Sequence, residues 1–400
     1  MKAIILAAGE GTRCRPLTFT RSKVMLPIAN KPMIEYVVRA LYDNEIVDII
    51  IVVGYAKERI MNYFGNGKDF DLHIEYVEQK QQLGTAHAID QVKDLVDDEF
   101  LVLNGDNLVS AETIADLIKR HEGGISILTA ASANAAEYAI VEETNTKVKR
   151  IVEGQKLKKV SNINTGIYIL NPDIFDAIRG TLQSNLGEFG VTNSIQNMVD
   201  DDYNVHAYKT NHTWVDVAHS WNLLDVNARI LEDVSRSVQG TIHGTIKGQV
   251  TVGSNSNIRW GSYITGPVVI GKNCDIGANV VIAPSTSIGD NVTIEPFTYI
   301  RNSVIFDNVY IGSQSTIKNS IIAENNIIGS HLITDTGKDL LIELDGILYH
   351  ADELGTILGD NNIIGGNVSM MAGTLVGTEC RIETGTVIRK QIPNHSLVMQ

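Results

Sequence analysis

The stretch ITGPVVIGKNCDIGANVVIAPSTSIGDNVTIEPFTYI (Ile264–Ile300) carries an isoleucine at every sixth position. This period fits neither an α-helix, which repeats about every 3.6 residues, nor a simple strand, whose side chains alternate. It is typical of a parallel β-helix, in which a hexapeptide forms one short flat face and its aliphatic side chain points into the coil. Glycine and asparagine between the isoleucines suit the corners, which need unusual backbone angles (Gly271, Asn273, Gly277, Asn279, Gly289 and Asn291).

The same rhythm continues on both sides of this stretch. It begins at Ile246, slips by one residue after Ile300, stops after Ile328 and resumes from Leu358 to Ile388. The break contains the charged alternation GKDLLIELDGILYHADE, which predicts a hairpin or loop that leaves the coil and returns. We therefore predict a left-handed parallel β-helix of roughly seven coils over residues 241–400, with an excursion at about residues 330–356.

The first half of the chain alternates short β-rich runs with longer amphipathic runs. The expected strands are Lys2–Ala8, Ile49–Val53, His73–Val77 and Phe100–Leu103, and the expected helices are Lys31–Asn44, Thr85–Val96 and Ala111–Glu122. This alternation predicts an α/β domain over residues 1–220, Rossmann-like, with a mostly parallel sheet covered by helices on both faces. In such sheets ligands bind at the carboxyl ends of the strands. Residues 221–240 are expected to form a helical linker.

The composition is that of an ordinary globular protein, with 44% hydrophobic and 20% charged residues. A net charge of −14 argues against a general nucleic-acid or membrane-surface binder, although a few placed cations can still hold a nucleotide. The three cysteines lie far apart and have no metal-ligand spacing, so neither a disulfide framework nor a zinc site is expected. No signal peptide or transmembrane run is recognised, and the cytoplasm is the expected location.

The segment LAAGEGTRCRPLT directly follows the first expected strand. Gly9 and Gly11 can let the backbone pass close to phosphates, and neighbouring amides can donate to phosphate oxygens. Arg13, Arg15 and Lys23 supply cations for a triphosphate. Taken alone this is a weak signal, because an ordinary tight turn between a strand and a helix could have the same sequence. The motif also matches neither the P-loop nor the Rossmann fingerprint.

Polar residues at other strand ends strengthen the hypothesis. Gln79, before the Gly84–Thr85 turn, has an amide that can read the polar edge of a pyrimidine. The run VLNGDN ends a buried strand at Asp106, and WVDV offers a second carboxylate, Asp216. Carboxylates at strand ends can hold magnesium, and together with a cationic glycine-rich loop they suit a metal-assisted attack on a nucleotide.

As a set, these motifs resemble the sugar-phosphate nucleotidylyltransferases, and with the β-helix attached the chain resembles the archaeal relatives of the bifunctional N-acetylglucosamine-1-phosphate uridylyltransferase. LAAGEGTRCRPLT, Lys23, QLGTAHA, NGD, NTGIYI and WVD stand in the family order and cover nearly the whole chain. The resemblance implies nucleotide binding by the first loop and the Gln79 region, with Mg²⁺ on Asp106 and Asp216. It implies the following residues: for the nucleotide Leu6, Ala8, Gly9, Gly11, Thr12, Arg13, Lys23, Gln79, Gly84 and Thr85, and for the sugar Asn104, Gly105, Glu153, Asn164 and Thr165.

The implied reaction joins a nucleoside triphosphate to a sugar 1-phosphate and releases pyrophosphate. The sugar phosphate is already an anion, so the protein needs no general base; it must screen the repulsion between two anions and align the attack. Arg13, Lys23, Asp106 and Asp216 are the expected catalytic residues. UTP and N-acetylglucosamine 1-phosphate are the preferred substrates, but Gln79 cannot separate uracil from thymine, so a dTDP-glucose synthase remains the alternative.

Some positions depart from the family pattern. Ala139 and Ala218 stand where glycine is usual, and Glu153-Gly154-Gln155 stands where the family has Glu-Lys-Pro, a lysine that meets the sugar phosphate. Lys156, Lys158 and Lys159 could substitute for that lysine. These departures leave open a non-catalytic, regulatory subunit that binds nucleotide sugar.

The β-helix raises a separate question, because similar domains transfer acetyl groups from acetyl coenzyme A. The histidine-bearing stretch of those relatives is absent, and His331 and His350 are candidates only by proximity. We therefore favour an oligomerisation platform or regulatory surface, with acetyl coenzyme A as a substrate only if this domain is active. A homotrimer is the expected assembly.

Overall fold

The structure, a computed structural model, describes residues 1–132, 138–152, 160–181 and 187–399. The chain forms two compact units, the first made of residues 1–10 and 33–216 and the second of residues 11–32 and 217–400. The loop that follows the first strand therefore belongs mostly to the unit that contains the β-helix. Within the described residues, no helix has both the length and the apolar character that a membrane crossing requires.

The first unit is built on a nine-stranded sheet in the order β5-β4-β1-β6-β11-β8-β12-β10-β9. Its strands are β1 Lys2–Ala7, β4 Asp48–Val53, β5 His73–Glu78, β6 Phe100–Asn104, β8 Ile125–Ser132, β9 Ile140–Thr144, β10 Lys147–Val152, β11 Ser161–Leu170 and β12 Val205–Lys209. Strands β5, β4, β1 and β6 are parallel, as predicted, but β11 runs antiparallel to both β6 and β8. The sheet is therefore mixed, because the second half of the unit returns through antiparallel neighbours such as the tight β9–β10 pair.

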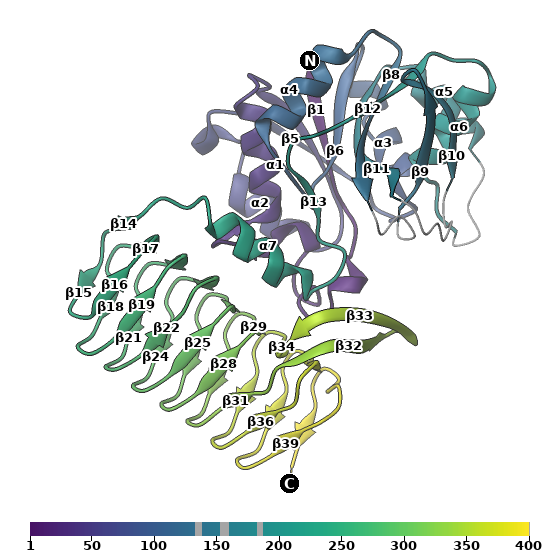
Figure 1. The fold of residues 1–400 in the computed structure, drawn as a ribbon. Coiled ribbons are helices and arrows are strands. Elements are labelled where there is room, and N and C mark those ends of the chain that lie inside the picture. The colour runs from purple at the N-terminus through teal and green to yellow at the C-terminus, as the bar shows by residue number, and fades with distance from the viewer. Residues whose placement is uncertain (133–137, 153–159, 182–186, 400) are drawn as a thin grey trace. The chain divides into compact units, whose positions relative to one another are not determined.

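Helices cover this sheet, as Figure 1 shows. They are α1 Met33–Tyr42, α2 Lys57–Phe64, α3 Thr85–Asp90, α4 Ala111–Arg120, α5 Ile174–Gly180 and α6 Val191–Asp200. Apolar side chains of α3, α5 and α6 share one core with alternate residues of the strands, among them Ile4, Ile50 and Val102. The intervening strand residues Ala3 and Ile5 are equally buried, so both faces of the sheet are covered.

Several helix boundaries differ from the sequence-based prediction, and the end of α3 differs the most. Helix α3 ends at Asp90 instead of Val96, because the chain tightens there into a 3₁₀ turn, η4 (Lys93–Leu95), with Leu95 N–H bonded to Val92 O. Helix α1 begins at Met33, after a small antiparallel pair of strands, β2 (Pro27–Ile28) and β3 (Lys31–Pro32). Two further 3₁₀ turns, η1 (Thr12–Cys14) and η2 (Lys23–Met25), lie in the loop after β1, and η3 (Lys68–Phe70) follows α2.

The second unit is a parallel β-helix with three stacked sheets (Figure 1). The first sheet contains β14 Ser237–Val238, β17 Val250–Val252, β20 Val268–Ile270, β23 Thr286–Ile288, β26 Val304–Ile305, β29 Ile321–Ile322, β34 Thr356–Leu358 and β37 Thr374–Val376. The second contains β15 Thr241–Ile242, β18 Asn257–Ile258, β21 Asp275–Ile276, β24 Thr293–Ile294, β27 Tyr310–Ile311, β30 Ile327–Ile328, β35 Ile363–Ile364, β38 Arg381–Ile382 and β40 Leu397–Val398. The third contains β16 Thr245–Lys247, β19 Tyr263–Thr265, β22 Val281–Ile282, β25 Tyr299–Arg301, β28 Thr316–Lys318, β31 Ile333–Thr334, β36 Ser369–Met370 and β39 Val387–Ile388.

The six-residue isoleucine rhythm forms the core of this coil, as predicted. Ile258 pairs with Ile276 and Ile276 with Ile294, and all three side chains are at most 1% exposed. With eight or nine described strands in each sheet, the coil is longer than the seven turns expected, because it already begins at β14, before Ile246. An antiparallel hairpin, β32 (Gly337–Leu344) and β33 (Ile347–Leu354), occupies the break in the rhythm.

The corners confirm the role of asparagine but correct the reason for glycine. Asn273, Asn279 and Asn291 have positive φ angles of 56 to 58°, which asparagine tolerates better than most residues. Gly271 and Gly277 do not have positive φ. They are needed because a Cβ atom on either would collide with the backbone or a side-chain oxygen of the next coil.

Helix α7 (Asn222–Leu231) lies where the helical linker was expected and packs in the second unit. Leu231 forms a small core with Ala29 and Val269. Asn227 Oδ1 accepts hydrogen bonds from the Ala29 N–H (2.9 Å) and the Ser287 hydroxyl (2.6 Å). The helix therefore joins the loop after β1 to the coil.

Candidate active site

Two carboxylates lie at the ends of neighbouring strands in the first unit. Asp106 follows β6 in a tight turn and precedes β7 (Asn107–Val109), which pairs with β13 (Trp214–Asp216) in an antiparallel ladder. The ladder sets Asp216 directly opposite Asn107, the residue next to Asp106. Strand pairing thus brings together two half-buried acidic residues that are far apart in the sequence.

This donor set fits magnesium. No three described His, Cys, Asp or Glu residues are arranged to hold a metal ion. Magnesium, however, commonly uses one or two carboxylates and takes its other ligands from water and substrate phosphates. Asp106 and Asp216 could supply the protein's share of such a site.

Tyr138 contacts one of these carboxylates and was missed by the sequence reasoning. Its hydroxyl donates to Asp216 Oδ2 at 3.3 Å, and its ring meets Trp214 edge-on, with 6.0 Å between the ring centroids. Trp214 in turn donates from its indole N–H to the Thr165 carbonyl at 3.2 Å. Tyr138 directly precedes Ala139 in the sequence, but no local pattern links the tyrosine to Asp216.

The expected sugar-facing residues on β11 lie at a break in the strand register, between Asn164 and Tyr168. The Asn164 amide donates to the Tyr168 hydroxyl at 2.6 Å and accepts from the Gly166 N–H at 3.2 Å. Thr165 is 2% exposed and donates to Leu128 O at 2.7 Å. Both side chains are thus engaged with the protein, so their direct effect is to fix the shape of this bulge.

Asn104 lies against the same bulge. A Cβ atom on Gly166, whose φ is +77°, would collide with the Asn104 amide, so the glycine permits this close approach. The neighbouring Gly105 N–H donates to Leu6 O at 2.9 Å, which ties the strand end to β1. Glu153 lies outside the described residues, as do Gly154, Gln155 and the lysines at 156, 158 and 159.

The expected base-reading residues form a compact turn. Gln79 is 3% exposed, and its Nε2 lies 3.1 Å from Gly84 O and 2.9 Å from His87 Nδ1. The amide nitrogen is therefore occupied, and Oε1 is the atom that could accept a hydrogen bond from a base. Next to it, Lys57 forms an ion pair with Glu78 (2.6 Å) and lowers the pKa of that carboxyl.

The structure explains why glycine and threonine occur at positions 84 and 85 of this turn. Gly84 has φ +105°, and a Cβ atom there would lie 2.5 Å from Phe189 O. The Thr85 hydroxyl accepts a hydrogen bond from the N–H of Val191, the first residue of α6, at 3.0 Å. Both residues therefore hold the 84–90 segment against the start of α6.

At the end of β1, backbone groups secure the loop that was expected to receive phosphates. The Ala8 carbonyl accepts a hydrogen bond from Tyr55 N–H at 3.1 Å. Gly54, which the sequence reasoning did not single out, lets this carbonyl and the Gln82 side chain approach closely. By contrast, a Cβ atom on Gly9 would have no heavy atom of the described protein within 4 Å, apart from its chain neighbours. Packing within the protein therefore does not require glycine at position 9.

The cationic part of the expected site lies in the second unit. Thr12 and Arg13 are exposed on the 3₁₀ turn η1, and Lys23 begins η2. Gly11 has φ +66°, and a Cβ atom there would lie 2.6 Å from Lys23 Cβ, so glycine at this position lets the two turns pack together. Arg15, the other cation proposed from the sequence, stacks on Phe19 with 5.0 Å between Cζ and the ring centroid.

The histidines considered for acetyl transfer both belong to the second unit. His331 is an exposed corner residue of the coil with φ +64°. His350 is half exposed on the hairpin, where its ring nitrogens lie 3.5 Å from Asp339 and 3.2 Å from Asp352.

Comparison with known families and proteins finds two matching regions in the chain. Residues 2–233 match the family described as Nucleotidyl transferase, and residues 264–400 match the family described as GMPPB C-terminal domain. Several proteins named Bifunctional protein GlmU match along the whole chain. That of Methanococcus maripaludis strain S2 is 31% identical and that of Methanocaldococcus jannaschii 32%, each over 100% of this chain and 97% of the relative.

Other relatives match only part of the chain. The glucose-1-phosphate thymidylyltransferase of Streptomyces antibioticus is 31% identical over 69% of this chain and 79% of its own length. A solved structure of a candidate glucose-1-phosphate thymidylyltransferase from Bacillus anthracis, in complex with a sucrose, superposes with a TM-score of 0.53 at 28% identity. That match covers 59% of this chain and 97% of the other.

Proposed function

Because this chain belongs to the nucleotidyl transferase family, we propose that it transfers a uridylyl group from UTP to N-acetylglucosamine 1-phosphate and releases pyrophosphate. At the coarser level, it is a sugar-1-phosphate nucleotidyltransferase. The structural observation that carries the proposal is the β7–β13 pairing, which sets Asp216 opposite the neighbour of Asp106. The choice of substrates is supported by the full-length likeness to relatives named Bifunctional protein GlmU.

In the proposed reaction, Asp106 and Asp216 would hold Mg²⁺, and Arg13 and Lys23 would bind the triphosphate together with the backbone around Gly9 and Gly11. The metal would supply positive charge that neutralises the phosphate oxygens. Because the sugar phosphate attacks as an anion, the protein's work is to screen charge and to align the attacking oxygen with the α-phosphorus. Tyr138 would orient the Asp216 carboxylate through its hydroxyl.

The base and the sugar would meet different elements. Gln79 would accept a hydrogen bond from the pyrimidine at Oε1, with Gly84 and Thr85 shaping the turn around it. Asn104, Gly105, Glu153, Asn164 and Thr165 are proposed to form the sugar side, with Asn164 and Thr165 acting through the bulge that they stabilise. The β-helix would serve as a platform for a cytoplasmic homotrimer, and acetyl coenzyme A would be a substrate only if this domain is active.

A second candidate is a glucose-1-phosphate thymidylyltransferase, favoured by the 31% identity to the Streptomyces antibioticus protein. A third is a regulatory nucleotide-sugar-binding subunit, motivated by Ala139 and Gly154. We propose that residues 1–220 form the catalytic part, that residues 221–240 form a linker, and that residues 241–400 form the β-helix.

The experiment that separates these functions is a grid of pyrophosphate release with magnesium. It crosses UTP and dTTP with the 1-phosphates of glucose, glucosamine and N-acetylglucosamine. The proposal expects the highest kcat/KM for UTP with N-acetylglucosamine 1-phosphate. A maximum with dTTP and glucose 1-phosphate would favour the second candidate, and nucleotide binding without any turnover would favour the third.

Variants of the proposed metal site complete this test. Asp106→Asn and Asp216→Asn should each lower kcat by about a hundredfold or more and raise the magnesium concentration needed. Asp201→Asn, at an exposed aspartate just after α6, is the matched control and should retain full activity. Equal activity in all three variants would contradict the metal assignment.

A further inference from the structure

Arg21 is a buried cation between the two 3₁₀ turns of the loop after β1. Its side chain is 1% exposed, and its guanidinium Cζ lies 5.2 Å from the centroid of the Phe306 ring in the β-helix. Burying a guanidinium is costly unless carboxylates or other acceptors replace its lost hydration. The partners of Arg21 therefore determine where this loop is held.

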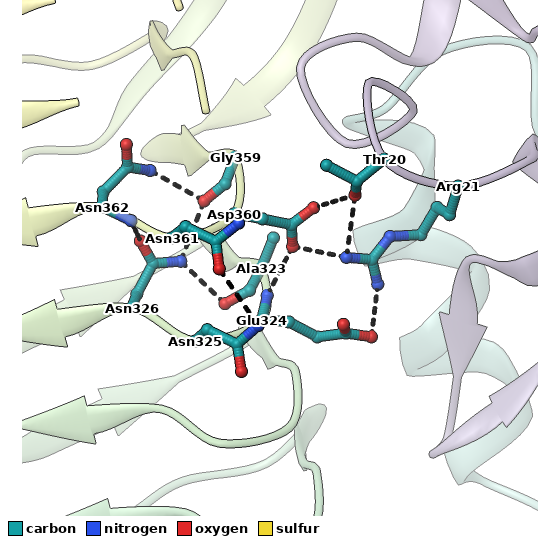
Figure 2. Close-up of polar contacts among 10 residues, drawn as sticks. All are labelled: Thr20, Arg21, Ala323, Glu324, Asn325, Asn326, Gly359, Asp360, Asn361 and Asn362. Carbon is teal, nitrogen blue, oxygen red and sulfur yellow. Dashed lines mark hydrogen bonds and ion pairs between the residues drawn. The ribbon is translucent and has the colours of Figure 1, made fainter. Parts of the chain in front are cut away.

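Both acidic partners belong to the β-helix (Figure 2). Nη1 donates to Glu324 Oε1 at 2.7 Å, and Nη2 donates to Asp360 Oδ1. The Thr20 hydroxyl donates to the other oxygen of Asp360. Two consecutive residues of the loop thus bind one row of corner residues on the coil.

Glu324 and Asp360 are neighbours on adjacent turns although the hairpin separates them in the sequence. The Glu324 N–H donates to Asp360 Oδ1 at 2.8 Å. The same corner bond recurs along the coil, from Lys272 N–H to Asp290 and from Asp290 N–H to Asp307, each at 2.7 Å. Asn394 makes it as well, accepting from Thr378 N–H at 2.8 Å, so the bond requires a side-chain oxygen but no charge.

The loop held by Arg21 is closed on itself and carries the proposed phosphate-binding cations. Lys23 is two residues from Arg21 and packs against Gly11. The Thr18 hydroxyl and the Cys14 N–H both donate to Gly11 O at 2.9 Å. A shift of Arg21 would therefore move Lys23 and the turn that bears Arg13 together.

We propose that Glu324 and Asp360 are positioning residues for the phosphate-binding loop, so that the β-helix sets the affinity of the enzyme for the nucleoside triphosphate. This inference rests on the proposed function for the role of Arg13 and Lys23. The carboxylates touch no substrate; they act by fixing Arg21, and through it the loop. The negative charge of Asp360 binds Arg21 and so holds the loop. The hydrogen bond that Asp360 accepts from the Glu324 N–H joins adjacent turns of the coil.

The test compares Asp360→Asn with Asp290→Asn in the full-length protein. Both variants keep an oxygen for the corner bond, as Asn394 does, but of these two aspartates it is Asp360 that binds Arg21. Asp307 is a less suitable control, because burial raises its pKa and the nearby Arg21 guanidinium opposes that rise. Glu324→Gln is a further variant, since its side chain takes no part in the corner bond of its own turn.

The first readout is steady-state kinetics. Asp360→Asn should raise the KM for the nucleoside triphosphate by about ten- to hundredfold, the range associated with a misplacement of roughly 1 Å. The KM for the sugar 1-phosphate should change little, Glu324→Gln should show a smaller increase, and Asp290→Asn should match the unmodified protein. A variant that is only partly unfolded would lower apparent kcat without changing KM, so this pattern separates positioning from simple damage.

The second readout, hydrogen–deuterium exchange of amides in residues 11–28, does not depend on activity. Exchange there should be faster in Asp360→Asn and unchanged in Asp290→Asn. Equal exchange and equal nucleotide KM in the two variants would overturn the inference. If the unmodified protein transfers no nucleotidyl group but only Asp360→Asn loosens the loop, the proposed function fails while the anchoring of the loop stands.

Discussion

Two glycines in the loop after β1 lack a side chain for different physical reasons. Gly11 has φ +66° and packs against Lys23, so a larger residue would be strained and would collide. Gly9 has neither constraint, since a Cβ atom there would have no described heavy atom within 4 Å apart from its chain neighbours. Packing within the protein explains the glycine at position 11. A glycine at position 9 is explained only if a ligand approaches the backbone there.

This difference predicts opposite behaviour for two alanine variants. Gly11→Ala should lower the free energy of unfolding by about 1–2 kcal/mol or more, from left-handed strain alone, and should lower Tm accordingly. Gly9→Ala should leave Tm unchanged but raise the KM for the nucleotide. Thermal unfolding and pyrophosphate-release kinetics check the pair; a Gly9→Ala variant with unchanged KM would remove the reason for placing phosphates at this glycine.

Cys274 gives a residue-scale prediction of pH dependence. Burial raises the pKa of this thiol to about 11, its side chain is 2% exposed, and its Sγ–H donates to Gly289 O at 3.1 Å. Since the folded state binds the proton more tightly than the unfolded state, the stability contributed by the neutral thiol is fully present below pH 9 and is lost as pH rises towards 11.

The change in free energy of unfolding attributable to this group should be at most about 3 kcal/mol. Other groups titrate in the same range, so the measurement is the difference between the protein and Cys274→Val, because the next coil has Val292 at the paired position. Denaturant unfolding at several pH values should show a steeper loss between pH 9 and 11 with cysteine than with valine. If the free energy of unfolding fell equally steeply with pH in both proteins, the fold would not raise the pKa of the Cys274 thiol.

At the scale of elements, the isoleucines of the β-helix strands differ sharply in burial. Ile276 on β21 is fully buried, whereas Ile327 on β30 of the same sheet is 54% exposed. Because each coil contacts only the coils beside it, stability along such an array depends on the contacts between neighbouring turns. Isoleucines that look alike in the sequence therefore contribute differently to the free energy of unfolding.

Ile276→Ala should lower the free energy of unfolding by about 2–5 kcal/mol, through lost burial and the cavity left behind. Ile327→Ala should change it by no more than about 0.5 kcal/mol, as expected at an exposed site. The midpoint of denaturant unfolding checks both variants side by side. A comparable loss in Ile327→Ala would indicate that this face is covered, for example by another copy of the chain.

At the scale of the whole molecule, the compact units do not follow the order of the sequence. Residues 11–32 belong to the same unit as residues 217–400. Besides the Arg21 cluster, Asn30 donates to Ile288 O at 2.5 Å and Ala29 bonds to Asn227. The loop that carries Arg13 and Lys23 is thus packed with the β-helix.

A fragment ending at Asp233, the end of the matched nucleotidyl transferase region, should therefore be impaired. Arg21 would lose Phe306 and both acidic partners, and Ala29 and Leu231 would lose their contact with Val269, so the loop would lose the contacts that hold it. We expect a lower Tm and a higher nucleotide KM than in the full chain, measured by thermal unfolding and kinetics. A fragment with the Tm and KM of the whole protein would refute this dependence on the coil.

Local and periodic signals in the sequence were enough to predict much of this protein. The six-residue rhythm predicted the β-helix and its buried isoleucines, because each coil repeats the same short-range geometry. The apolar runs predicted the four parallel strands and the helices near them. Asp106 and Asp216 were recognised as strand-end carboxylates, although their approach to each other depends on the β7–β13 pairing.

Contacts between distant segments were decided only by the tertiary structure. No local pattern predicted the antiparallel half of the sheet, the contact of Tyr138 with Asp216, or the reason for glycine at the coil corners. No sequence pattern singled out Arg21, and its partner Asp360 lies 339 residues away. The sequence specifies which side chains can carry charge or fill a core, whereas burial and long-range pairing decide which of them meet.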